Sequence, residues 1–135
     1  MKNTCRALLT LLFVYAASVK LLDLDHFKNE MAAQPFPPAA AKILTYLVPL
    51  SELLAAGLLV ARKSAGDRLA LALMAAFTGY TGLVLAGYFS RLPCACGGIL
   101  SGMGWGAHLI FNSIFLIISI GNIRAKGNAE NLRKE

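Results

Sequence analysis

The sequence predicts an all-α membrane protein, a bundle of four transmembrane helices with both termini in the cytoplasm. Composition is the first reason, because the 135 residues are 57% hydrophobic and only 15% charged. A soluble domain is nearer to half apolar and a quarter charged. The second reason is that the formal charges leave long apolar runs between them, and about 20 apolar residues cross a bilayer. The third is an uneven placement of the basic residues along the chain.

Four apolar runs are long enough to span a membrane. Leu69–Phe89 and Ile99–Ile123 carry no formal charge, and Ala39–Ala61 is interrupted by Lys42 and Glu52. With the first run described below, these define one membrane domain over residues 1–135. We expect its helices at about 7–22, 39–61, 69–89 and 101–123, followed by a flexible tail at 124–135.

The first run, Ala7–Leu22, also has the features of a signal peptide, namely basic residues before it and small residues near its end. We expect it to be retained as a helix. Lys20 can lengthen this short span by carrying its ammonium to the membrane interface.

Two sequence patterns predict how the spans are connected and packed. Between Leu21 and Met31, apolar and charged residues alternate as in a short amphipathic helix on the membrane surface. In the third span, small residues recur every three or four positions, and such a face lets membrane helices pack closely. We expect this stripe to pack inside the bundle; it consists of Ala72, Ala75, Gly79, Gly82 and Ala86.

The basic residues predict the topology. Nine of the 13 lysines and arginines lie on the side of the two termini: Lys2, Arg6, Arg62, Lys63, Arg68, Arg124, Lys126, Arg133 and Lys134. Because basic loops stay in the cytoplasm, both termini are expected there, and the net charge of +6 is explained without nucleic acid. In a bacterium this describes a multi-pass protein of the inner membrane, with its other two loops facing the periplasm.

Cys94 and Cys96 are the main candidates for chemistry, and the topology places both in the second outer loop. Disulfide closure needs Cα atoms about 4.4–6.8 Å apart, so the chain must bend, and Pro93 with Gly97 makes a bend plausible. A strained, exposed disulfide tends to exchange readily. We interpret the two residues as a redox pair; a soft-metal site and two merely packed cysteines are the alternatives. Cys5 lies on the cytoplasmic side and is expected to stay reduced.

Polar residues inside the spans form a second group of candidates. Trp105, His108 and Asn112 share one face of the fourth helix, which should point into the bundle because polar groups are costly in lipid. Glu52 is expected at a depth similar to that of Asn112. These residues could relay protons or bind a ligand such as a quinone, and His108 could join the cysteines around a soft metal. The alternatives are hydrogen bonds that tie the helices together and, for Trp105, an anchor at the interface.

The chain resembles the small four-helix membrane proteins of the MauE type, within the broader DoxX-like group. The matching segments are RALLTLLFVYAASVKLLDLDHF (Arg6–Phe27), LVPLSELLAAGLL (Leu47–Leu59), PCACGG (Pro93–Gly98) and WGAHLIFN (Trp105–Asn112). The resemblance implies an inner-membrane bundle linked to redox work or to maturation of a secreted redox protein; MauE itself is linked to methylamine utilisation. The chain is more distantly similar to quinone-coupled disulfide-forming enzymes of the vitamin K epoxide reductase and DsbB kind. Those carry CxxC, whereas this chain has CAC and no second outer pair.

The leading functional hypothesis is therefore thiol–disulfide exchange or electron transfer by Cys94 and Cys96 with a periplasmic or membrane protein partner. A quinone is the candidate electron acceptor, with Glu52, His108, Asn112 and Trp105 as proton-relay or ligand-binding residues. The alternative is a non-catalytic membrane subunit or maturation factor of a larger complex. We assign no metal ligand among the leading candidates.

Overall fold

The structure, a computed structural model, describes residues 2–89, 102 and 104–132. Within these ranges the chain forms five α-helices and no strand: α1 (Lys2–Leu22), α2 (Leu24–Ala32), α3 (Pro38–Val60), α4 (Ser64–Leu85) and α5 (Trp105–Leu132). All except α2 are long and apolar enough to cross a membrane. The predicted fold class is confirmed, whereas the side of the membrane on which the termini lie stays a prediction.

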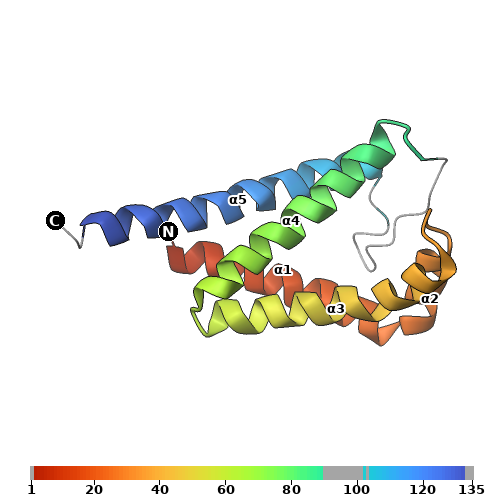
Figure 1. The fold of residues 1–135 in the computed structure, drawn as a ribbon, viewed down its shortest axis with the longest axis horizontal. Coiled ribbons are helices and arrows are strands. Elements are labelled where there is room, and N and C mark those ends of the chain that lie inside the picture. Colours follow the sequence, from red (N-terminus) through yellow and green to blue (C-terminus); the bar gives the residue numbers. More distant parts are fainter. Residues whose placement is uncertain (1, 90–101, 103, 133–135) are drawn as a thin grey trace.

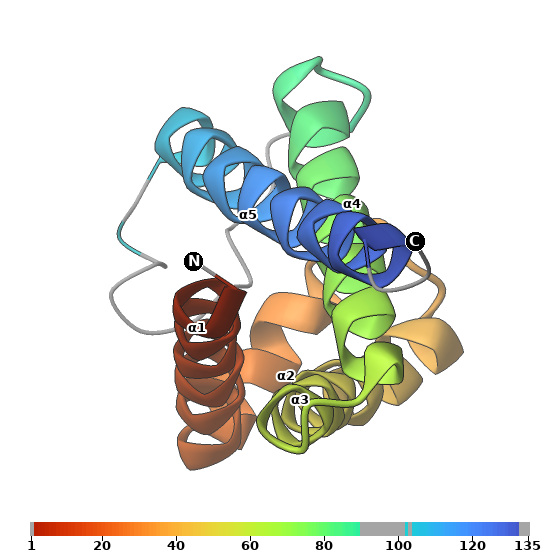
Figure 2. The ribbon, with the colours of Figure 1, turned by 90° about the vertical axis from the view of Figure 1, so that its left-hand side faces the viewer.

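The four long helices lie roughly lengthwise in an elongated bundle (Figure 1). Both termini lie at one end of it, and α2 lies at the other. Helix α1 packs mainly against α3, and α4 packs mainly against α5. Seen from the terminus end, α1 and α3 are neighbours, with α5 on the opposite side (Figure 2). The fold therefore consists of two helix pairs, and the functional candidates lie between them.

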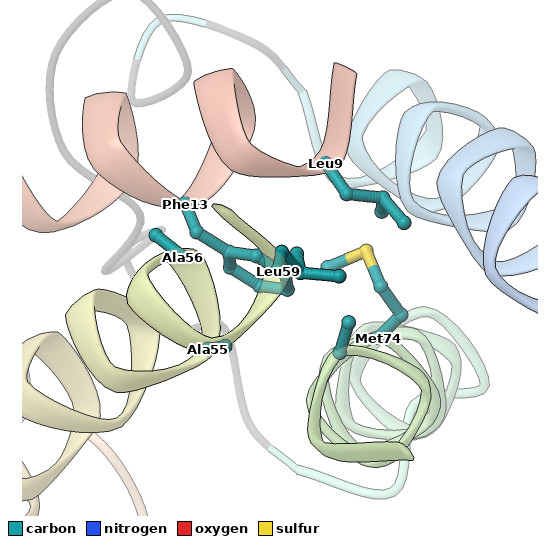
Figure 3. Close-up of a cluster of buried hydrophobic side chains, with 7 residues drawn as sticks. Leu9, Phe13, Ala55, Ala56, Leu59 and Met74 are labelled. Atoms are coloured by element: carbon teal, nitrogen blue, oxygen red, sulfur yellow. The ribbon is translucent and has the colours of Figure 1, made fainter. Parts of the chain in front are cut away.

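An apolar core joins the pairs in the half of the bundle nearer the termini. Leu9 and Phe13 of α1 point toward Leu59 of α3 and Met74 of α4 (Figure 3). All four side chains are at most 2% exposed, and small alanines from α3 and α4 complete the cluster. The buried positions of α1 and α3 recur every three to four residues, as one face of a helix requires.

Helix α2 confirms the predicted short amphipathic helix. Asp23 accepts a hydrogen bond from the backbone N–H of His26 at 3.2 Å and so caps the helix. Phe27 and Met31 are buried, while Lys28 faces outward beside Asp25. That contact raises the pKa of Lys28 through its hydrogen bond with the Asp25 carboxylate.

Helix α4 differs from the sequence-based prediction in its buried face. The stripe of small residues does not pack inside the bundle, since Ala72, Ala75, Gly79 and Ala86 are exposed and Gly82 is only half-buried. The buried side chains are instead Asp67, Ala70, Met74 and Thr81, because this face brings both polar groups to partners in the bundle. Helix α4 also begins at Ser64, before the predicted start at Leu69, and α5 continues to Leu132, beyond the predicted end at Ile123.

Candidate functional site

A cavity of about 500 Å³ lies between the two helix pairs. All five helices contribute to its wall, which is mainly apolar. The polar lining side chains are few and come from four different segments: Lys20, Ser51, Glu52, Tyr80, Thr81, Trp105, His108 and Asn112. A cavity of this size with few polar groups is typical of a small-molecule site.

A buried ion pair forms the most polar part of the wall. The Lys20 ammonium of α1 donates to both carboxylate oxygens of Glu52 in α3, at 2.9 and 3.2 Å, and to the carbonyl of Ala16 at 3.2 Å. Their side chains are 6% and 1% exposed. The expectation that Lys20 reaches the membrane interface is therefore wrong. A partner at Glu52 offers the ammonium an ion pair inside the bundle, and a paired charge is less costly to bury than an isolated carboxylate.

Helix α5 supplies the opposite wall. Asn112 donates to the Thr81 hydroxyl of α4 at 3.3 Å, and Thr81 donates in turn to the carbonyl of Phe77 at 2.7 Å. His108 is one turn earlier on the same face and is 2% exposed. Both side chains line the cavity together with Glu52. The carboxylate and the two α5 side chains thus face one space from different helices.

Aromatic rings line the end of the cavity nearer α2. The ring of Tyr80 stacks on Phe36 with centroids 5.8 Å apart and meets the edge of Trp105 at 6.5 Å. The Tyr80 hydroxyl donates to the side-chain oxygen of Gln34, which fixes the ring in place. Trp105, Tyr80 and Phe36 all line the cavity. The structure therefore places Trp105 in the wall of the cavity.

A second polar cluster lies nearer the termini and outside the cavity lining. Arg6 of α1 donates two hydrogen bonds to Asp67 of α4, at 2.9 and 2.5 Å. Asn122 of α5 donates a third to Asp67 at 2.7 Å. All three residues are at most 8% exposed. The Asp67 carboxylate thus ties three helices together.

Comparison with known protein families gives a match over most of the chain. The family model described as "Methylamine utilisation protein MauE" matches residues 1–124. The chain belongs to the MauE family. The matched range covers nearly all of the four long helices and every residue of the cavity wall. No curated protein and no solved structure matches the chain.

In this MauE-family protein, the predicted redox pair, Cys94 and Cys96, lies outside the described residues. Cys5 is described, half-buried and free. Among the residues that the structure describes, no group of three or more His, Cys, Asp or Glu side chains could hold a metal ion.

Three partners in buried polar contacts were not predicted from the sequence: Lys20, Asp67 and Asn122. A signal for Asn122 was available, since His108, Asn112, Ser119 and Asn122 continue one helical face of α5. For Asp67, the signal was its position two residues before the apolar run that begins at Leu69. The predicted topology puts it on the same side of the membrane as the basic residue Arg6. In the part of the chain that the structure describes, this MauE-family bundle therefore carries two separate buried ion pairs.

Proposed function

We propose that this membrane protein is a thiol–disulfide redox protein whose electron acceptor is a quinone held in the cavity between the two helix pairs. Cys94 and Cys96 would exchange a disulfide with a partner on the α2 side of the bilayer. The observation that carries the proposal is the cavity itself, which is apolar, lies within the spans and holds Glu52, His108 and Asn112 in its wall. In sequence, the two cysteines shortly precede Trp105, the first residue of α5 and part of that wall.

The reaction balances with a quinone as co-reactant. When two thiols become a disulfide, they release two electrons and two protons, and a quinone that accepts all four becomes a quinol. The lining fits such a ligand, because apolar side chains surround a ring while a few donors meet its oxygens. His108 and Glu52 are the titratable groups that would hand protons across the cavity.

Charge placement supports an inner-membrane topology in which α2 faces the periplasm. The positive-inside rule compares the numbers of lysines and arginines on the two sides of the membrane. Arg6 and Lys20 are buried in ion pairs, so one residue is left out of the count on each side. Eight lysines and arginines then remain on the terminus side, against Lys28, Lys42 and Arg91 on the other. This bias still favours cytoplasmic termini.

Single cysteine variants test the exchange reaction. A Cys96→Ala or Cys94→Ala variant retains one thiol and should accumulate a mixed disulfide with its partner, visible by mass spectrometry of non-reduced samples. The double variant is the control and should trap nothing. If neither single variant captures a partner and both keep full function, the redox proposal is wrong.

The second candidate function is a non-catalytic subunit or maturation factor, and the outward stripe on α4 favours it. A Cβ added at Gly79 or Gly82 would meet nothing within 4 Å, so the outside of α4 presents small residues to its surroundings. Such faces allow another membrane helix to approach closely. Under this alternative, replacing both cysteines would leave co-purifying partners and activity unchanged.

A further inference from the structure

The two buried ion pairs among the described residues have different surroundings. Asp67 receives donors from both Arg6 and Asn122, and none of these three described side chains lines the cavity. Lys20 and Glu52, in contrast, both lie in the cavity wall. A buried ion pair is weak evidence for stability, because well-packed apolar side chains often stabilise a fold as well or better. The pair that faces the cavity therefore needs a reason other than stability.

The charge balance of the wall limits what can bind there. Among the described residues that line the cavity, Lys20 is the one lysine or arginine and Glu52 the one aspartate or glutamate, so their formal charges cancel. A charged ligand would have to break the ion pair to gain a counter-ion, leaving the other partner buried and unpaired. An uncharged ligand that carries acceptor oxygens avoids this penalty. The wall thus favours a neutral, mainly apolar molecule.

The geometry of Lys20 allows it to share a hydrogen bond with such a ligand. Its contact with one oxygen of Glu52 is short, at 2.9 Å, whereas the contacts with the second oxygen and with the carbonyl of Ala16 are both 3.2 Å. An ammonium has three donors on a rotatable bond. One donor can therefore turn from the second carboxylate oxygen to a ligand while the shorter contact holds the side chain in place.

We propose that Lys20 donates a hydrogen bond to a carbonyl oxygen of an uncharged quinone in this cavity, with Glu52 as the residue that positions the ammonium. This inference rests on the proposed function, to which it adds the residue that donates a hydrogen bond to the quinone. The aromatic rings of Trp105 and Tyr80 give the same cavity flat surfaces for a ring. Binding alone is involved, and no bond is made or broken.

Trp105 provides the readout, because it is the single tryptophan of the chain and lies in the cavity wall. The full-length protein in detergent micelles is titrated with duroquinone, a fully methylated benzoquinone without free positions for thiol addition, while quenching of tryptophan fluorescence is followed. Durene, which has the same methylated ring without the oxygens, serves as a competitor. The wild-type protein should bind duroquinone saturably and prefer it over durene.

Paired substitutions separate the donor from the fold. Lys20→Met with Glu52→Met removes both charges and leaves none unpaired. Because a hydrogen bond from a charged donor is among the stronger kind, duroquinone binding should weaken about 10-fold or more, and the preference over durene should fall by the same factor. Arg6→Met with Asp67→Met is the matched control outside the cavity, and its dissociation constant should stay within about 2-fold of wild type.

The outcomes distinguish this inference from the proposed function. If the wild-type protein binds duroquinone and the Lys20/Glu52 variant binds it equally well or more tightly, Lys20 is not the donor, while the quinone site stands. If the wild-type protein shows no saturable quenching, the quinone part of the proposed function fails and this inference fails with it. If the methionine pair does not fold, Lys20→Leu with Glu52→Leu decides, since leucine has no hydrogen-bond donor and unchanged binding in this pair also overturns the proposal.

Discussion

Asp67→Ala should be among the most destabilising single substitutions in this protein. It removes the acceptor of two hydrogen bonds from Arg6 and one from Asn122, at 2.9, 2.5 and 2.7 Å. The guanidinium then stays in a position that is only 8% exposed. Breaking one side of a buried ion pair in this way costs about 3–5 kcal/mol. We expect a loss of that size in the free energy of unfolding.

Reversible unfolding in mixed micelles, at rising mole fraction of sodium dodecyl sulfate, measures this loss through far-ultraviolet circular dichroism. Two controls isolate the buried charge. Arg6→Met with Asp67→Met removes both charges and should recover most of the stability lost in the single variant. Asp25→Ala breaks the exposed pair with Lys28, whose side chains are 93% and 45% exposed, and should leave the unfolding transition almost unchanged.

Two results would refute this reasoning. A loss below about 1 kcal/mol for Asp67→Ala would mean that Arg6 reaches water or lipid head groups once its partner is gone. A double variant as unstable as the single one would mean that the cost comes from lost packing and from Asn122 rather than from an unpaired charge.

Three further predictions follow from the packing and the topology. Gly66→Ala should lower the free energy of unfolding by about 1–3 kcal/mol, since the added Cβ would lie 2.7 Å from backbone atoms near the end of α3. Gly79→Ala is the control and should be neutral or stabilising, because a Cβ there has open space around it. Phe13→Ala should cost about 3–5 kcal/mol in the same assay and Leu11→Ala far less, because Phe13 is 1% and Leu11 67% exposed. In a variant with Cys94→Ala and Cys96→Ala, a membrane-impermeant maleimide should label Cys5 in inside-out vesicles but not in intact cells. Labelling of Cys5 in intact cells would reverse the proposed topology.

The spans could be predicted from the sequence because hydropathy is a local property. Each apolar run identifies a helix whatever its neighbours are, and Glu52 and Asn112 could be assigned a depth by counting residues along their helices. The partner of Glu52 could not be found in this way. Whether Lys20 turns to the interface or to the carboxylate depends on how α1 rotates against α3, and that rotation is set by packing across the whole bundle.

The face of α4 shows a second limit of the sequence. The spacing of Ala72, Ala75 and Gly79 correctly places them on one face of a helix, but it does not say whether that face points inward. Helix α4 also has a competing face with Asp67 and Thr81. Burying these polar groups against partners avoids exposing a carboxylate to lipid, which outweighs the close packing that small residues allow.

The buried face of α1 shows how the bundle separates its two polar clusters. It begins with Arg6, ends with Lys20, and carries Leu9 and Phe13 between them. Fourteen residues of helix correspond to about 21 Å, and the apolar core fills this interval with side chains from α3 and α4 as well. The Arg6–Asp67 cluster can therefore fix the terminus end of the bundle without contact with the cavity. Polar chemistry in the cavity belongs to the α2 end, which is also the side on which the predicted topology puts Cys94 and Cys96.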